Sequence, residues 1–327
     1  MNNSNRTDRW IKAWLCAAVL LPFALGAKVS QEFKEACRDG ALARICFTIV
    51  DDVGSPVPDA RVNVFFDMMD RSQGRRVIGT TDTNGICVAE AKTGGTLEIE
   101  VSRKGYYDTR TELCFIVMGQ EHEVRDGKWQ PWNMVKKLRL LPIRNPVAKV
   151  TSSPVWKTTT EYNKWVGFDL VMYDFVEPYG KGRIADMDVM FEWDGRLGKK
   201  YNGMALKVRF NGEYSGGYYA DRFLESGIKG IYKADVQQSY QKEFAFSETV
   251  VRNKRGWAEH LQRQLFDPTK VLVCRSRCVL NEDGTLKSAL YFQIVFLQFA
   301  CDSEGTSIKF LSVYNPTPND TNLEAKQ

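Results

Sequence analysis

The sequence contains only two histidines, His122 and His260, in 327 residues. Neither lies in a His-x-x-Glu or His-Glu-x-x-His pattern, so the chain lacks the ligands of a zinc peptidase. It also lacks a basic block, because 45 Lys and Arg are mixed with 40 Asp and Glu to give a net charge of +5. This mixture argues against a nucleic-acid partner. We also expect no cofactor.

Long hydrophobic runs are absent beyond the N-terminus. The most apolar later segment, residues 289–300, is interrupted by Gln293 and Gln298. A membrane-spanning helix needs about 20 mostly apolar residues, and this segment is shorter. We therefore expect no membrane span in the mature chain.

The N-terminus has the pattern of a secretory signal peptide. Arg6, Arg9 and Lys12 precede an apolar run over residues 13–27 that ends in small residues. At about 1.5 Å per residue this run is shorter than a bilayer core of about 30 Å, which disfavours the alternative of an uncleaved anchor. The residues before Cys16 do not form a lipoprotein processing box. The sequence predicts cleavage of residues 1–27 and export to the periplasm, the cell surface or the medium.

Eight cysteines are present, and an odd number remains once Cys16 leaves with the signal peptide. At least one is then free or bonded between chains. We predict disulfides between Cys46 and Cys114, and between Cys301 and either Cys274 or Cys278, with buried free thiols as the simpler alternative. Cys274 and Cys278 could supply two thiolates to a metal ion, but there is no second spaced cysteine pair and no nearby histidine. We therefore expect no metal site.

Alternating apolar and polar residues predict strands through most of the chain. Ile45, Phe47 and Ile49 alternate with more polar residues, which indicates one buried face. Turns rich in Asp, Asn, Gly and Pro follow at residues 51–58 and 82–85. Seven short strands in about a hundred residues are typical of a two-sheet sandwich, and the fold class is predicted to be all-β.

Three segments carry a family resemblance: VDDVGSPVPDARV at 50–62, TDTNG at 81–85 and VSRKGY at 101–106. In this order they resemble the carboxypeptidase regulatory-like domain over residues 42–142. The resemblance implies a prealbumin-like sandwich, related to starch-binding-type folds, that accompanies enzymes or surface proteins without catalysing a reaction. Some relatives bind carbohydrate. Asp59 is a departure, since the family usually has glycine there.

The remaining sequence predicts a second, larger β domain. Residues 143–160 contain prolines and a Ser/Thr-rich stretch typical of a linker, and residues 161–314 show further strand patterns. Short helices are expected near residues 220–226 and 255–266, the latter from apolar residues at spacings of four. Residues 315–327 are polar and are predicted to form a loose tail.

Aromatic residues favour a binding function for this second domain. They are Trp156, Trp165, Tyr173, Tyr179, Trp193, Tyr201, Tyr214, Tyr218 and Tyr219. The most plausible exposed patch comprises Tyr214, Tyr218, Tyr219, Asp221 and Arg222, where sugar rings could pack on aromatic faces. Burial in the core is the alternative. The arrangement is similar to that of bacterial envelope proteins and predicts a non-catalytic protein that binds a glycan or envelope polymer. A structural component that binds an envelope protein through a strand edge is the alternative.

An enzyme is the third hypothesis. Asp186 with Asp188, and Glu192 with Asp194, could supply the two carboxylates of a glycosidase. A solvated strand face explains this period-two pattern more simply. Ser215 is displaced by one position from the Gly-x-Ser-x-Gly pattern of a nucleophile elbow, and we expect a turn there.

Overall fold

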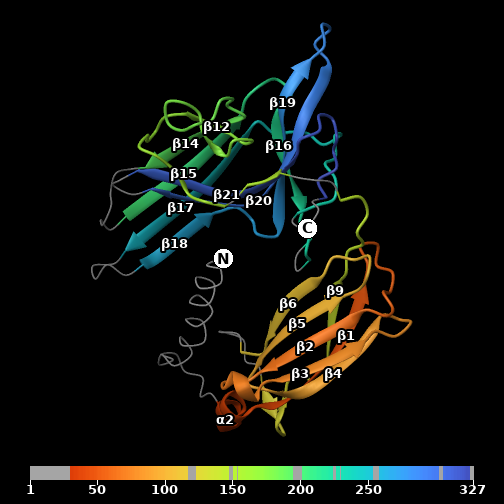
Figure 1. Cartoon of the computed structure of the whole chain (residues 1–327). Coiled ribbons are helices and arrows are strands. Elements are labelled where there is room, and N and C mark those ends of the chain that lie inside the picture. The colour runs from red at the N-terminus through yellow and green to blue at the C-terminus, as the bar shows by residue number, and fades with distance from the viewer. Residues whose placement is uncertain are drawn as a thin grey trace.

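The structure is a computed structural model that describes residues 30–116, 123–146, 150–152, 154–193, 201–223, 226–228, 230–252, 258–301 and 305–324. The predicted signal peptide lies outside these residues. Strands dominate, which confirms the all-β class (Figure 1). Within the described ranges, no helix is long and apolar enough to cross a membrane.

An N-terminal sandwich occupies residues 31–141. Its elements are α2 (Gln31–Asp39), β1 (Ala41–Val50), β2 (Arg61–Asp67), η2 (Arg71–Gln73), β3 (Arg75–Thr80), β4 (Ile86–Thr93), β5 (Thr96–Ser102), β6 (Thr109–Cys114), β7 (Val124–Arg125), β8 (Lys128–Trp129) and β9 (Met134–Arg139). One sheet has the order β4-β1-β8-β7, with β9 also paired to β1, and the other has the order β3-β2-β5-β6.

The core of this sandwich follows the alternation in the sequence. Ile45, Phe47 and Ile49 are fully buried, as predicted, together with Phe66 and Trp129. The turn before β4 depends on Gly85, whose φ is +73°. A Cβ at Gly85 would lie 2.4 Å from the carbonyl oxygen of Ile49, so only glycine fits there.

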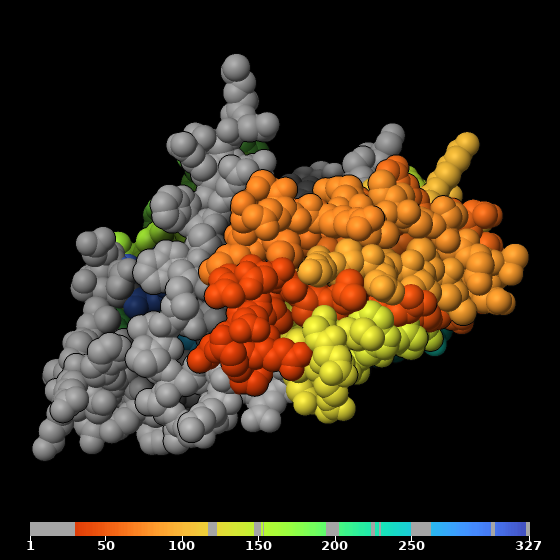
Figure 2. Space-filling view, turned by 90° about the horizontal axis from the view of Figure 1, so that it is seen from below, coloured from red at the N-terminus to blue at the C-terminus, as the bar shows by residue number. Residues whose placement is uncertain are grey.

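Helix α2 was not predicted, although its end signals are present in the sequence. The Oγ of Ser30 accepts a hydrogen bond from the N–H of Phe33 at 3.1 Å, and Gly40 ends the helix with a φ of +78°. The Phe33 ring packs edge-on against Trp129. Glu32 accepts a hydrogen bond from the N–H of Gly127, so α2 lies beside the β7–β8 segment (Figure 2).

A C-terminal sandwich occupies residues 150–324. Its strands are β10 (Val150–Thr151), β11 (Lys157–Thr159), β12 (Val166–Asp169), β13 (Asp174–Phe175), β14 (Met187–Trp193), β15 (Tyr201–Phe210), β16 (Gly216–Asp221), β17 (Glu243–Arg252), β18 (Ala258–Gln264), β19 (Lys270–Leu280), β20 (Leu286–Cys301) and β21 (Thr306–Asn315).

Two sheets form this second sandwich. One has the order β10-β21-β20-β19-β16, with β11 also paired to β21, and the other has the order β13-β12-β14-β15-β17-β18. Their facing sides share a core that includes Phe168, Phe191, Phe246, Phe292 and Phe310. The opposite side of the β19–β20 sheet is covered by a smaller cluster that includes residues of the 231–240 loop and Leu323.

The predictions of a linker and a loose tail were wrong. β10 and β11 lie within residues 143–160 and pair with β21, so this segment belongs to the C-terminal sandwich. The predicted tail is held in place up to residue 324, since Leu323 is fully buried and Glu324 is nearly so. The polar side chains of this segment bond within the fold, as when Asn315 donates to the carbonyl of Asn322.

The two helices predicted for the second domain were also wrong. Ala220 and Asp221 end strand β16, and residues 258–264 form strand β18, which pairs with β17. Residues 255–257 lie outside the described part. Leu265 is 45% exposed, so the spacing of four does not mark a buried helical face. Pairing with β17 overrides the local pattern here.

Direct contacts join the two sandwiches. Tyr107 and Leu141 from the first pack against Ile228 from the second. The N–H of Gly227 donates to the carbonyl of Asp108 at 2.7 Å. The hydroxyl of Tyr232 donates to the carbonyl of Pro142 at 2.6 Å. The junction therefore combines a small apolar cluster with hydrogen bonds.

Candidate functional site

The predicted tyrosine patch does not form one surface. Tyr218 and Tyr219 are neighbours in β16, and their side chains lie on opposite faces of the sheet. The Tyr218 hydroxyl accepts a hydrogen bond from the N–H of Asp235 at 2.7 Å, and its ring packs edge-on against Tyr240. Tyr219, which is 43% exposed, packs on the other side against Phe244.

The other residues of that predicted patch have separate partners. Asp221 is exposed and pairs with Lys270 at 2.6 Å. Arg222 is half-buried, which lowers its pKa, and its Nη1 donates to the carbonyl of Val295 at 3.3 Å. The carbonyl of Tyr214 accepts from Nε of Arg275. The structure therefore does not bring the five residues together around a shared space.

The first predicted acid pair is also divided. Asp186 is buried, where it accepts hydrogen bonds from Ser276 at 2.8 Å and from Nε of Arg277 at 3.0 Å. Asp188 lies on the outer face of β14 and pairs with Arg209 at 2.8 Å. Two carboxylates in separate networks, one of them buried beneath arginine, do not form a glycosidase site.

Asp169 completes the buried network around Arg277. Its Oδ1 accepts from Nη2 of Arg277 at 2.7 Å, and its Oδ2 accepts from the N–H groups of Arg183 and Ile184. Burial alone would raise the pKa of Asp169. The backbone hydrogen bonds from Met172, Arg183 and Ile184, together with the positive charge of Arg277, outweigh this effect and lower the pKa overall. The network crosses the core and links β12 to β19, which indicates a structural role.

The remaining sequence-based enzyme candidates have structural partners. Glu192 pairs with Lys207 at 2.6 Å, whereas Asp194 lies outside the described residues. Ser215 is buried in a turn that leads into a strand, and its hydroxyl donates to Sγ of Cys278 at 3.5 Å. This agrees with the predicted turn. The described part of the chain also contains no group of His, Cys, Asp and Glu that could hold a metal ion.

The disulfide predictions were wrong, because none of the seven cysteines of the described residues forms a disulfide. Cys46 lies in β1 and Cys114 in β6, which belong to different sheets. Cys274 lies opposite Phe292, whereas Cys301 lies at the far end of β20 opposite Thr306. The Sγ of Cys278 accepts the hydrogen bond from Ser215 described above. Alternation along single strands did not show which strands would be neighbours.

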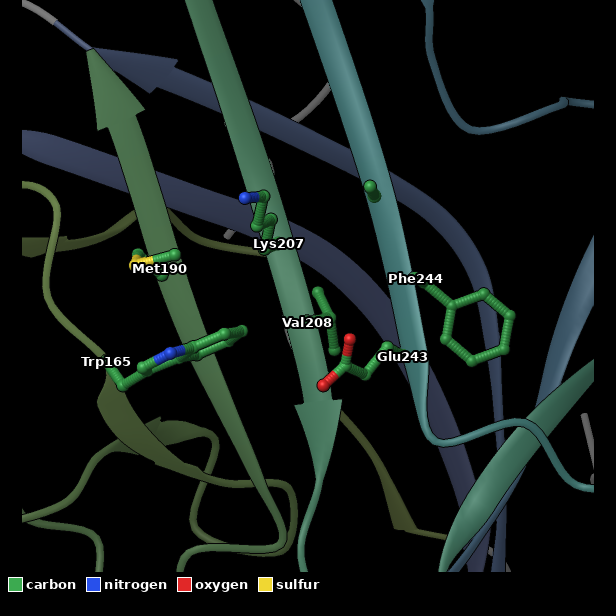
Figure 3. A pocket seen from close by; sticks show the side chains of 7 residues that line it. Trp165, Met190, Lys207, Val208, Glu243 and Phe244 are labelled. Carbon is green, nitrogen blue, oxygen red and sulfur yellow. The ribbon is translucent and has the colours of Figure 1, made fainter.

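A depression of about 280 Å³ on the outer face of β14, β15 and β17 is the best candidate for a ligand site (Figure 3). We call it the Trp165 depression, and its lining residues are Trp165, Met190, Lys207, Val208, Glu243, Phe244 and Ala245. Met190, Lys207 and Ala245 lie in one row, since Lys207 is directly opposite both of the others in the strand register. Paired strands therefore position these three side chains, whereas Trp165 immediately precedes β12.

The side chains of the Trp165 depression combine an aromatic surface with both charge signs. The Trp165 ring is partly exposed, and the guanidinium carbon of Arg209 lies 4.4 Å from its centroid. Glu243 is exposed and forms no ion pair or side-chain hydrogen bond within the described residues. An apolar ring beside an available carboxylate and an ammonium group can bind a molecule with one apolar face and several hydroxyls.

Trp165 is one of the aromatic residues noted in the sequence, but the predicted binding patch does not include it. The available signal was the alternation in β14, which places Met190 on the outer face with Asp188 and Glu192. The contributions of β15 and β17 depend on strand order. Only the register shows that Lys207 and Ala245 share the row of Met190.

Comparisons with known proteins show no matching family model and no matching curated protein. Among solved structures, 3-chlorocatechol 1,2-dioxygenase from Rhodococcus opacus 1CP is similar at 12% identity and a TM-score of 0.26, covering 32% of this chain and 61% of that one. Catechol 1,2-dioxygenase from Acinetobacter radioresistens has 16% identity and a TM-score of 0.25, covering 32% and 53%. The chain thus matches about half to three-fifths of these enzymes' lengths, and such low TM-scores transfer no activity.

Proposed function

We propose that this is an exported, non-catalytic protein that binds carbohydrate or a related polymer of the bacterial cell envelope. The observation that carries the proposal is the Trp165 depression, where a partly exposed indole lies beside Lys207 and Glu243. Indole rings offer a large, rigid contact surface at low conformational cost. Such a surface suits the apolar face of a sugar ring.

Each lining group has a defined part in this proposal. The sugar ring packs on Trp165 and Met190, while hydroxyls donate to the Glu243 carboxylate and accept from Lys207. The volume of about 280 Å³ fits about one sugar unit, since pockets for larger drug-sized ligands begin at about 300 Å³. A longer glycan would continue across the outer face of the sheet.

Two features of the sequence support this proposal. The basic and then apolar N-terminus is typical of an exported protein, which would meet envelope polymers. The resemblance of residues 42–142 to the carboxypeptidase regulatory-like domain implies an accessory module in a family where some members bind carbohydrate. Neither feature identifies the sugar.

A glycan and envelope-polymer array on the mature chain, residues 28–327, tests the proposal. We expect selective binding that weakens at least tenfold in Trp165→Ala and in Glu243→Gln. Trp156→Ala is the matched control, because Trp156 is 47% exposed and has Lys309 over its ring at 5.8 Å. No binding to any glycan, or equal losses in the Trp165 and Trp156 variants, would refute the proposal.

A structural component that binds an envelope protein is the second candidate. The outer face of β4, β1 and β9 supports it, because Val88, Cys46 and Val135 lie in one row across these strands. Val88 is 42% and Val135 67% exposed, so this row leaves apolar side chains uncovered on both sides of Cys46. The test is the sedimentation of envelope extracts. A larger complex that is lost in Val135→Asp, together with no glycan binding, would favour this candidate.

A further inference from the structure

A second depression, of about 450 Å³, lies on the N-terminal sandwich. We call it the Arg61 depression, and its lining residues are Asp59, Arg61, Ser102, Arg103, Lys104 and Asp108. It is formed where β2 begins, where β5 ends and just before β6. It shares no lining residue with the Trp165 depression.

The backbone brings three cationic side chains to this place. Arg61 is directly opposite Ser102 in the pairing of β2 with β5. Arg103 and Lys104 follow in a turn closed by a hydrogen bond from Tyr106 N–H to the carbonyl of Arg103 at 3.1 Å. The guanidinium of Arg103 also lies over the Tyr106 ring, with its central carbon 5.5 Å from the centroid. Strand pairing and a closed turn therefore hold the cations in one region.

These three cations have no ion pair with any described residue, in contrast to other arginines beside the same sheet. Arg71 pairs with Glu98 at 2.8 Å, and Arg110 pairs with Glu100 at 2.7 Å. Neighbouring arginines thus form ion pairs, whereas the three cations around the Arg61 depression form none with the described residues. They are therefore available to bind an anion from outside the chain. Guanidinium groups suit planar or tetrahedral oxyanions, because they can donate two parallel hydrogen bonds.

Two acidic residues in the lining further restrict the kind of ligand that fits. Asp59 lies on the β2 side, and Asp108 lies at the junction, where its carbonyl accepts from Gly227 N–H at 2.7 Å. Their carboxylates would disfavour an anion without hydroxyl groups, such as inorganic phosphate, but can accept hydrogen bonds from the hydroxyl groups of a sugar. A ligand that carries one oxyanion and several hydroxyls matches both sets of side chains.

We propose that the Arg61 depression binds an acidic sugar unit, with its carboxylate or phosphate at Arg61, Arg103 and Lys104 and its hydroxyls at Asp59 and Asp108. This is a site separate from the Trp165 depression and does not depend on it. One chain would then contact a glycan through two different sandwiches. Linked contacts of this kind raise the overall affinity without new interactions at either site.

Calorimetric titration of the mature chain with a short oligogalacturonate tests the proposal. We expect binding that weakens at least tenfold in Arg61→Ala and in Lys104→Ala, that partly recovers in Arg61→Lys, and that weakens with added salt. Arg75→Ala is the control, since Arg75 is exposed at the start of β3 in the same sheet. Circular dichroism checks that each variant is folded.

Three comparisons decide the outcome. The neutral galactose oligomer is expected to bind at least tenfold more weakly than the oligogalacturonate, and inorganic phosphate more weakly still. Binding that is unchanged in Trp165→Ala assigns the acidic sugar to the Arg61 depression. Equal affinity of Arg61→Ala and the unmodified chain, or phosphate binding as tight as that of the oligogalacturonate, would overturn the proposal.

Discussion

The hydroxyl of Tyr107, in the N-terminal sandwich, donates a hydrogen bond of 2.9 Å to Oε1 of Glu324, near the C-terminus. The same carboxylate accepts hydrogen bonds from the backbone N–H groups of Arg144 and Asn145 at 2.9 and 2.8 Å. Glu324 is only 2% exposed. One side chain therefore joins the first sandwich, the connecting segment and the C-terminal segment.

Glu324→Ala is expected to loosen this junction. It removes the acceptor of three hydrogen bonds, from the Tyr107 hydroxyl and from two part-buried backbone N–H groups, and a hydrogen bond contributes about 0.5–1.5 kcal/mol net. Hydrogen exchange at the amides of Arg144 and Asn145 measures the effect locally and is expected to become at least tenfold faster. Glu282→Ala, in an exposed turn, is the control. Unchanged exchange at both amides would contradict the assigned role.

Arg277 is expected to be essential for the stability of the C-terminal sandwich. Arg277→Met leaves the buried carboxylates of Asp169 and Asp186 without their cation, and removing one partner of a buried pair costs about 3–5 kcal/mol. Urea unfolding followed by tryptophan fluorescence measures the loss. The control, Arg38→Met, breaks an exposed pair with Asp39 and is expected to leave the free energy of unfolding nearly unchanged. Similar losses in both variants would refute the prediction.

The same network predicts a loss of stability in acid. Because the pKa of Asp169 is lowered in the folded protein, its ionised form contributes stability above the unfolded pKa of about 3.9. That contribution disappears as the pH falls below about 4 and through the folded pKa. The free energy of unfolding, measured from pH 7 to pH 3, is expected to fall less steeply in Asp169→Asn than in the unmodified chain. An equal slope in Asp169→Asn and in the unmodified chain would contradict this contribution.

Local alternation predicted much of the fold correctly. Ile45, Phe47 and Ile49 repeat with the period of a strand, and the structure buries all three. The same rule could have corrected the proposed binding patch, because adjacent residues of a strand point to opposite faces, which separates Tyr218 from Tyr219. The predicted patch was based on nearness in sequence, whereas the two-residue period of a strand determines which side chains share a face.

Long-range pairing accounts for most of what the sequence did not show. The contact of Asp186 with Arg277 spans 91 positions, and that of Tyr107 with Glu324 spans 217. Neither contact has a local signal. The Trp165 depression likewise depends on the placement of β17 beside β15, which fixes Ala245 next to Lys207. Burial of the C-terminal segment also depends on a surface formed by distant strands.

Cysteine reactivity provides a further test of the fold. Cys114 is exposed, whereas Cys274 is completely buried and burial raises its pKa strongly. Burial also raises the pKa of Cys37, to about 11. Because the thiolate is the reactive form, a maleimide at pH 7 is expected to label Cys114 at least a hundredfold faster than Cys274, with Cys37 between them. Peptide mass spectrometry measures the three rates, and labelling in urea confirms that each peptide is detected. Equal native rates for Cys114 and Cys274 would contradict the position of β19 in the core.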